Sequence, residues 1–210
     1  MNLRWQLAQW AEIQWWKRYL KKREPQAYLE WKFRYWSDFL ERTKTSPAPG
    51  ARILDAGCGP AGIFMALSNC QIDALDPLLD HYAALPHFEP KNYPWTDFHA
   101  EDLENHSIGA IYDQVFCLNA LNHMRDIPGS VRKLFRALKP GGKLVVSVDA
   151  HNKKFLRSLF RSIPMDVLHP FQEDLSGYRK LFFEEGFFEF NAICYKKGLI
   201  FDYWILVLSK

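Results

Sequence analysis

The sequence predicts an α/β fold: a mostly parallel, seven-stranded sheet with helices on both faces and an antiparallel hairpin at its C-terminal end. From residue 50 to about residue 148, short apolar runs alternate with helical stretches, which is typical of β-α-β units. Near the end of the chain, two strand-like runs flank Lys196-Lys-Gly198, which indicates a hairpin. We expect this domain, residues 50–210, to follow a helical arm and linker, residues 1–49.

Composition narrows the class of protein. The chain has 210 residues, 48% of them hydrophobic and 24% charged, which is typical of a globular domain with its own core. Its four cysteines stand far apart without a Cys-x-x-Cys pair, so we expect neither a zinc knuckle nor a disulfide scaffold, and no metal. No apolar run approaches the ~18 residues that span a bilayer, and the N-terminus lacks a signal-peptide core. These features predict a cytoplasmic protein.

Two helices are predicted in the arm. The apolar stripe of the first recurs at helical spacing and consists of Leu3, Leu7, Trp10, Ile13, Trp16 and Leu20. Pro25 suits the first turn of the second helix, whose stripe consists of Leu29, Phe33, Trp36 and Leu40. The breaker-rich segment 45–50 ends the arm.

The main domain continues with alternating elements. We expect strands at 52–54, 72–75, 96–99, 112–118 and 143–148, and helices near 62–68, 78–85 and 131–138. The segment 151–177 interrupts this order and is predicted to form a lid over a bound molecule, with Phe155 among the apolar side chains facing it. Strands at 187–195 and 199–208 form the hairpin.

The strongest local signal is the glycine loop after the first strand. Asp55 ends an apolar strand, and Gly57 and Gly59 allow positive φ and a close approach of backbone to a ligand. The N-terminus of the following helix would add free N–H groups, so the loop predicts a nucleotide-cofactor pocket.

The loop by itself leaves the cofactor open. Gly57-x-Gly59-x-x-Gly62, followed by Asp76, satisfies the dinucleotide fingerprint, so an NAD-dependent oxidoreductase is one alternative. Asp55 inside the turn would repel a pyrophosphate but attract an ammonium group, and no Tyr-x-x-x-Lys pair is present. These observations favour a positively charged cofactor.

In the order of its motifs, the chain resembles the class I S-adenosylmethionine-dependent methyltransferases over about residues 50–210. The matching pieces are the glycine loop, Asp76, the segment 100–103, the run from Asp113 to Met124, Leu134 to Gly142, His169-Pro170, and Phe183 to Phe187. The resemblance implies a Rossmann-like fold, S-adenosylmethionine as cofactor and transfer of its methyl group to a small molecule. A protein that keeps this fold as a binding module without turnover is a second alternative.

The resemblance also implies site residues. The implied cofactor-binding residues are Asp55, Gly57, Cys58, Gly59, Asp76, Pro77, Ala100, Glu101, Asp102, Leu118 and Asn119. Asp76 would accept hydrogen bonds from both ribose hydroxyls, while Asp55 would face the amino group and segment 100–102 the adenine. Each of these residues also has a purely structural alternative. Asp55 and Asp76 could cap a helix or turn, Glu101 and Asp102 could be solvated turn residues, and Cys58 could be a small packing residue.

The candidate general base is His123, which follows the fourth strand and therefore lies near the expected methyl group; local packing is its alternative. Asn122, His169 and Phe155 are the candidate substrate contacts.

Asn119 is not followed by the Pro-Pro-Tyr/Phe of amino-methylating nucleic-acid enzymes, so no nucleic-acid partner is expected. A hydrophobic or aromatic small molecule is the expected acceptor.

The arm combines tryptophans with basic charge. Six of the eight tryptophans precede residue 37, and residues 1–44 hold ten Lys/Arg against five Asp/Glu. Three interpretations follow: a membrane-surface helix, a cap over the cofactor with Tyr35 and Trp36 in contact with it, or a helix packed on the domain or on a second subunit.

Overall fold

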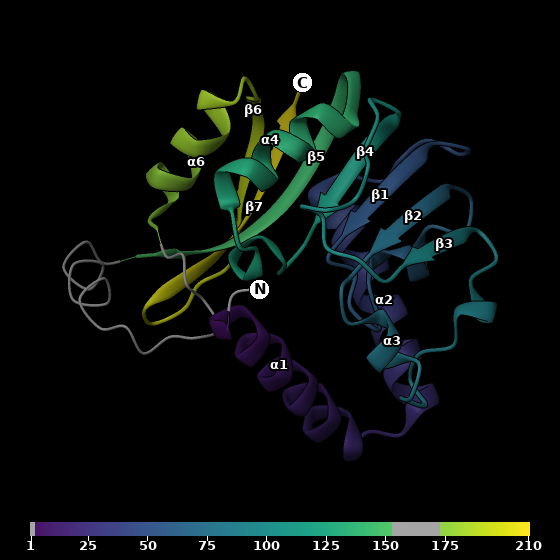
Figure 1. The fold of residues 1–210 in the computed structure, drawn as a ribbon. Coiled ribbons are helices and arrows are strands. Elements are labelled where there is room, and N and C mark those ends of the chain that lie inside the picture. The colour runs from purple at the N-terminus through teal and green to yellow at the C-terminus, as the bar shows by residue number, and fades with distance from the viewer. Residues whose placement is uncertain (1–2, 153–172) are drawn as a thin grey trace.

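A seven-stranded sheet forms the centre of the protein, with strand order β3-β2-β1-β4-β5-β7-β6 (Figure 1). The computed structural model describes residues 3–152 and 173–210. The strands are β1 (Arg52–Ala56), β2 (Gln71–Leu75), β3 (Thr96–His99), β4 (Tyr112–Cys117), β5 (Leu138–His151), β6 (Phe188–Lys196) and β7 (Phe201–Ser209). Strands β1 to β5 pair in parallel, and β7 pairs antiparallel with β5 and β6, which confirms the predicted sheet and hairpin.

Helices cover both faces of this sheet. They are α1 (Leu3–Lys21), α2 (Pro25–Thr43), α3 (Leu79–Tyr82), α4 (Ile127–Ala137) and α6 (Leu175–Glu184), with 3₁₀ turns η1 (Ile63–Ala66), η2 (Pro90–Asn92) and η3 (Leu121–His123). α4 and α6 share one apolar core with the sheet, while α2, η1 and α3 share the other. Among the described residues, no helix has the length and apolar character needed to cross a membrane.

The second helix begins where its proline predicts. Pro25 occupies the first turn, and the Glu24 carboxylate accepts hydrogen bonds from the backbone N–H of Gln26 (3.0 Å) and Ala27 (2.6 Å). Trp36 and Phe39 are buried against the sheet. The C-terminal half of the arm is therefore packed into the core of the domain that follows it.

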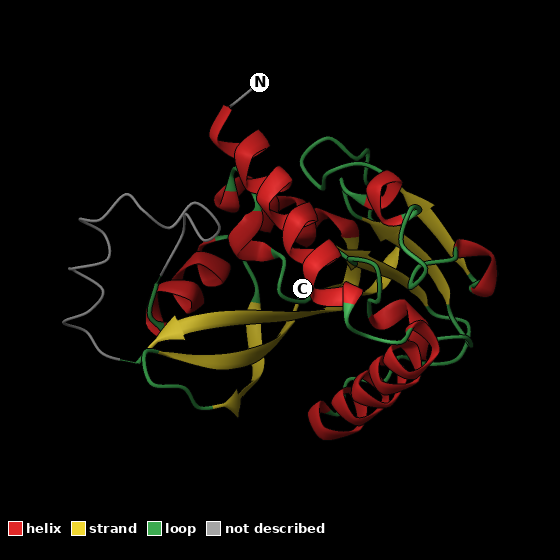
Figure 2. Cartoon of the chain, turned by 90° about the horizontal axis from the view of Figure 1, so that it is seen from below, coloured by secondary structure: helices red, strands yellow, loops and turns green. Residues whose placement is uncertain are grey.

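The chain order of the strands creates a crevice at one edge of the sheet. β1 lies between β2 and β4, so the crossovers from β1 and to β4 run in opposite directions across the sheet. Ligands bind outside the carboxyl ends of the strands at such a switch point. α1 lies past this end of the sheet, as the two views together show (Figures 1 and 2).

Some element predictions need correction. The helix expected near 62–68 is a single 3₁₀ turn, η1, because the chain must enter β2 only a few residues later. α3 is shorter than the expected helix at 78–85. β5 extends to His151, because its second half continues to pair with β7. α6 occupies the end of the segment predicted as a lid, and residues 153–172 of that segment lie outside the described residues.

Candidate active site

The glycine loop joins β1 to η1 at the carboxyl edge of the sheet. Gly57 (φ +77°) and Gly59 (φ +59°) both have positive φ, and the backbone N–H of Gly57 donates to the carbonyl of Leu75 (2.8 Å). A Cβ on Gly57 would overlap the side chain of Ala120. Glycine at 57 is thus required both by its backbone conformation and by the close approach of the loop after β4.

Two buried carboxylates lie beside this loop. Asp76, directly after β2, accepts hydrogen bonds from the N–H of Gly59 (3.0 Å) and of Leu78 (2.9 Å). Asp55, in β1, accepts a long one from the N–H of Phe64 (3.4 Å). Burial raises the pKa of Asp55 to about 7 and that of Asp76 to about 6. The neighbouring charge of Asp76 further raises the pKa of Asp55, so two closely spaced acidic groups lie beside the loop.

Two residues of the arm lie near these acids, and no sequence pattern had predicted either of them as part of the site. Burial, and then the neighbouring charge of Asp76, raise the pKa of Glu12 in α1 to about 7. Burial lowers the pKa of Lys32 in α2 to about 8, although Asp55 counteracts this shift. The side-chain nitrogen of Lys32 lies 4.5 Å from the ring centre of Trp36. The apolar stripes of the helices predict which face is buried but not which polar side chains reach the glycine loop.

Two adjoining cavities open at this edge. The smaller, about 90 Å³, is lined by the glycine loop and the ends of β2 and β3, including Gly57, Asp76, Pro77, Glu101 and Asp102. The larger measures about 500 Å³. Glu12, Asn119, Ala120 and His123 line both cavities. His123, the predicted base, is therefore at the junction between them.

Aromatic side chains dominate the wall of the larger cavity. They come from the two N-terminal helices and are Trp15, Trp16, Tyr19, Tyr28 and Trp31. Polar groups are placed among them: Lys32 from α2, and Asn122, Ser147 and Asp149 from the sheet side. A cavity of this size with an aromatic wall and a few polar groups is typical of a small-molecule site.

The loop after β4 carries an unusual backbone conformation. Asn119 has φ +56°, one of two described non-glycine residues with positive φ, and its N–H donates to the Ser147 hydroxyl (2.7 Å). Such conformations occur often at functional sites, where surrounding structure holds them. The Tyr178 hydroxyl donates to the side-chain oxygen of Asn122 (2.9 Å), which fixes the amide beside His123.

The acids expected near an adenine have protein partners. Glu101 pairs with His106, at 2.6 Å between Oε1 and Nδ1. Asp102 pairs with Arg125 (2.8 Å) and accepts from the N–H of Asn105 (2.9 Å). Both still line the smaller cavity, whereas Ala100 is exposed at the end of β3. Their contact with adenine stays a prediction.

Four further candidates, Tyr35, Trp36, Cys58 and Leu118, are not among the residues that line the two cavities. Trp36 is buried, and its indole N–H donates to the carbonyl of Ala61 (2.9 Å); the ring of Tyr35 packs on Trp31 and Trp36. Leu118 and Cys58 are buried, and burial raises the pKa of the Cys58 thiol well above its usual range, which fits packing rather than nucleophilic chemistry. Phe155 and His169 lie outside the described residues.

The fold and the site together define an α/β protein with two adjoining cavities at the switch point of a Rossmann-like sheet. A methyltransferase-domain family model matches residues 28–187, about three quarters of the chain, and the chain belongs to this family. Family membership confirms the predicted fold class and the predicted cofactor class, S-adenosylmethionine. The match begins inside α2, so the family's domain includes most of the second helix of the arm.

Curated relatives match over a shorter segment. The chain is 38% identical over 104 residues to a ubiquinone biosynthesis O-methyltransferase of Xanthomonas oryzae pv. oryzae, and 32% identical over 109 residues to one of Methylocella silvestris. These alignments span 47% and 49% of the chain, but only 43% and 42% of the relatives. The chain thus matches less than half the length of either relative.

Solved structures share the fold at low identity. N-methyltransferase NodS from Bradyrhizobium japonicum, solved with S-adenosylhomocysteine, aligns with a TM-score of 0.63 at 15% identity, covering 84% of this chain and 86% of that one. The 1,6-didemethyltoxoflavin-N1-methyltransferase of Burkholderia thailandensis aligns with a TM-score of 0.63 at 15% identity, covering 85% and 78%. These alignments support the architecture. They do not identify the reaction, which has to be argued from the residues of the site.

Proposed function

We propose that this protein is an S-adenosylmethionine-dependent methyltransferase that acts on a small hydrophobic or aromatic molecule. The observation that carries the proposal is the shared wall of the two cavities. His123 and Asn119 lie where a cavity lined by the glycine loop meets a cavity lined by aromatic side chains. A donor in the first and an acceptor in the second would meet beside His123.

The chemistry of the smaller cavity and its surroundings fits the cofactor. Asp76 lies at the end of β2, where a carboxylate can accept hydrogen bonds from two hydroxyl groups. Buried Asp55 and Asp76 favour a ligand that brings positive charge or hydrogen-bond donors, because an isolated buried carboxylate is costly. A dinucleotide would bring a pyrophosphate to this acidic loop, and the family match also argues against the oxidoreductase alternative.

The donor supplies a methyl group already activated by its sulfonium, so the chain mainly has to orient an acceptor and exclude water. Orientation of two reactants can contribute roughly 7–11 kcal/mol. α1 lies over the cavities and contributes Glu12, Trp15 and Trp16 to their walls, so it shields the reacting atoms from solvent. His123 takes the proton from an acceptor that carries one, a contribution of about 10²–10⁴ in rate.

The aromatic wall supports the proposed acceptor class. Flat aromatic molecules pack on tryptophan and tyrosine rings in offset or edge-to-face geometry, and at least five such rings line the larger cavity. Among the described residues that line this wall, Lys32 supplies a lysine ammonium, which would favour an acceptor with a phenolate or carboxylate group. The relatives named ubiquinone biosynthesis O-methyltransferases favour an oxygen nucleophile.

Calorimetric titration with S-adenosylhomocysteine, S-adenosylmethionine and NAD tests the cofactor, and a panel of phenols tests the acceptor. We expect S-adenosylmethionine and S-adenosylhomocysteine to bind and NAD not to bind.

Asp76→Asn should weaken S-adenosylhomocysteine binding by about 10- to 100-fold, because hydrogen bonds to a charged group contribute about 1.5–3 kcal/mol. Asp97→Asn, an exposed change in β3, serves as control. Binding of NAD alone would refute the proposal, and cofactor binding without transfer to any acceptor would favour the binding-module alternative.

A further inference from the structure

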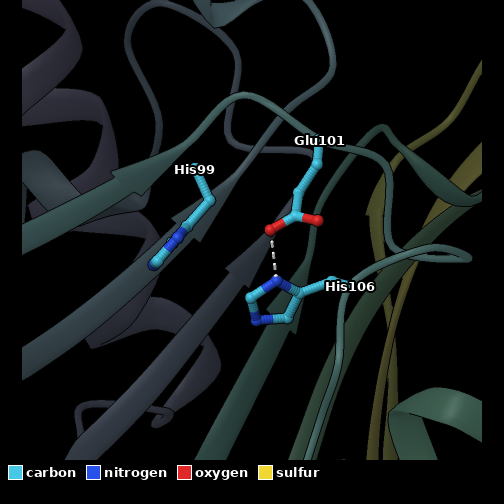
Figure 3. A group of neighbouring side chains, drawn as sticks. All are labelled: His99, Glu101 and His106. Atoms are coloured by element: carbon cyan, nitrogen blue, oxygen red, sulfur yellow. Dashed lines mark hydrogen bonds and ion pairs between the residues drawn. The ribbon is translucent and has the colours of Figure 1, made fainter.

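Two histidines and a glutamate form a cluster just beyond β3. His99 ends the strand, and Glu101 and His106 belong to the loop that follows. One ligand atom of each lies within 4.8 Å of those of the other two. The Glu101 carboxylate is directed at the His106 ring, with His99 beside them (Figure 3). The ring centres of His99 and His106 are 5.1 Å apart, so two imidazoles and a carboxylate lie close together.

A carboxylate behind His99 is the second relevant feature. The Nε2 atom of His99 lies 3.4 Å from Oδ1 of Asp73, and Asp73 is held in turn by Arg52 (3.2 Å). A carboxylate that engages one ring nitrogen fixes the tautomer and leaves the other nitrogen as a lone-pair donor. Histidines that bind metals almost always have such a partner.

The loop backbone is held by a lysine of α4. The Lys133 ammonium in α4 donates to the backbone carbonyls of Glu104 (2.7 Å) and His106 (2.6 Å). The backbone that carries the cluster is therefore tied to a helix. The three side chains remain accessible, with exposed fractions of 34% for His99, 14% for His106 and 41% for Glu101. An ion could enter from solvent without unfolding the loop.

We propose that His99, Glu101 and His106 form a Zn²⁺ site that fixes the loop after β3 at the edge of the smaller cavity. Zn²⁺ binds two histidines and a carboxylate with a fourth position open to water, whereas Ca²⁺ and Mg²⁺ prefer oxygen ligands alone. Zn–N and Zn–O distances are about 2.0–2.2 Å, so the donors must converge, and half-exposed Glu101 has the freedom to do so. The ion replaces the direct Glu101–His106 hydrogen bond.

The ion takes no part in the proposed methyl transfer, and this site was not expected from the sequence. The cysteine pattern argues against a zinc knuckle, but the cluster uses histidines that only the fold brings together. Glu101 belongs to the cluster and also lines the smaller cavity, so the ion would stiffen one wall of the proposed cofactor site.

Titration of the full chain with ZnCl₂ after removal of metals by EDTA tests the proposal. We expect one ion per chain, with His99→Gln and His106→Gln each weakening binding at least 10-fold. His81→Gln, an exposed histidine change on the neighbouring α3, should leave the affinity unchanged. Thermal unfolding of each variant checks that it folds.

X-ray absorption at the zinc edge of the unsubstituted protein gives a test that needs no variant. Two imidazole ligands with oxygen ligands are expected. Absence of stoichiometric binding, a ligand set without imidazole, or equal affinity in wild type and both cluster variants would overturn the site. S-adenosylhomocysteine titration of the same samples keeps the two proposals distinguishable: retained cofactor binding without zinc binding rejects only the metal site.

Discussion

At the scale of single residues, the candidate site depends on a backbone conformation that is strained for most L side chains. Gly57 and Gly141 have the same φ, +77°, but differ in their surroundings. Added Cβ atoms would overlap Ala120 at position 57 and meet nothing within 4 Å at position 141. Alanine at position 141 therefore measures the cost of backbone strain alone, whereas alanine at position 57 measures backbone strain together with the overlap with Ala120.

We expect Gly141→Ala to destabilise the protein by about 1–2 kcal/mol, the usual cost of a left-handed conformation for an L-residue. Gly57→Ala should cost about 1–3 kcal/mol more, because the glycine loop and the loop after β4 must also move apart. Urea denaturation of the cofactor-free protein measures both values. Equal losses in the two variants would show that the contact between the loops contributes little.

His123 has a role that can be tested separately from cofactor binding. If it accepts the proton of the acceptor, His123→Gln should lower kcat by about 10²- to 10⁴-fold with little change in affinity for S-adenosylhomocysteine. The comparison uses the best phenol from the acceptor panel, with His81→Gln as the matched histidine control. Unchanged turnover would remove His123 from the mechanism and leave orientation as the chain's main contribution.

At the scale of elements, the two N-terminal helices have different roles. α2 is part of the domain core, while α1 forms a wall of both cavities through Glu12. In α1, Trp16 packs edge-on against Tyr82, and Trp10 and Trp15 remain 62% and 49% exposed. This arrangement agrees with a helix that covers the site, while contact of the exposed tryptophans with a membrane surface stays a prediction.

The hydrogen bond between Trp36 and Ala61 links α2 to the loop that begins η1. Trp36→Phe keeps an aromatic side chain in the core but leaves the Ala61 carbonyl without this donor. We expect a loss of about 1–3 kcal/mol in the free energy of unfolding, measured by urea denaturation.

Trp31→Phe provides the matched control, because Trp31 lies on the same helix and is 47% exposed. It should change stability by less than about 0.5 kcal/mol. A single unfolding transition in the Trp36 variant would fit one cooperative unit of α2 and the sheet. A separate early transition of the arm would instead favour the predicted boundary at residue 50.

At the scale of the whole molecule, an acidic site closed by α1 links stability to pH. Burial raises the pKa of Glu12 and Asp55 to about 7 and that of Asp76 to about 6. Between about pH 4 and pH 7, these carboxyls hold more protons in the folded chain than in the unfolded chain, where they ionise near pH 4. Their contribution to stability is complete below about pH 4 and is lost as pH rises towards 7.

The cofactor-free protein should therefore have a lower Tm at pH 7.5 than at pH 5.5, by several degrees. Glu12→Gln should reduce this difference, because it removes one of the three titrating groups, whereas Glu30→Gln on the exposed side of α2 should leave it unchanged. Differential scanning calorimetry across this range measures the effect. A Tm that rises steadily over the same interval in wild type would contradict it.

The sequence by itself predicted the strands, the hairpin, the start of α2 at Pro25 and the acids around the glycine loop. These are local signals: alternation of apolar runs, turn residues and the position of Asp55 and Asp76 at strand ends. It predicted a full helix at 62–68, where the structure has only η1, because periodicity carries no information on how soon the chain must enter β2.

Tertiary structure alone decided what surrounds those acids. The apolar stripe of α1 predicts a buried face but not the surface against which it packs, so Glu12 and Lys32 could not be assigned to the site from the sequence. The same holds for His99, Glu101 and His106, whose shared space depends on the path of the loop after β3. Short-range periodicity determines elements, whereas contacts between distant segments depend on side-chain packing across the whole fold.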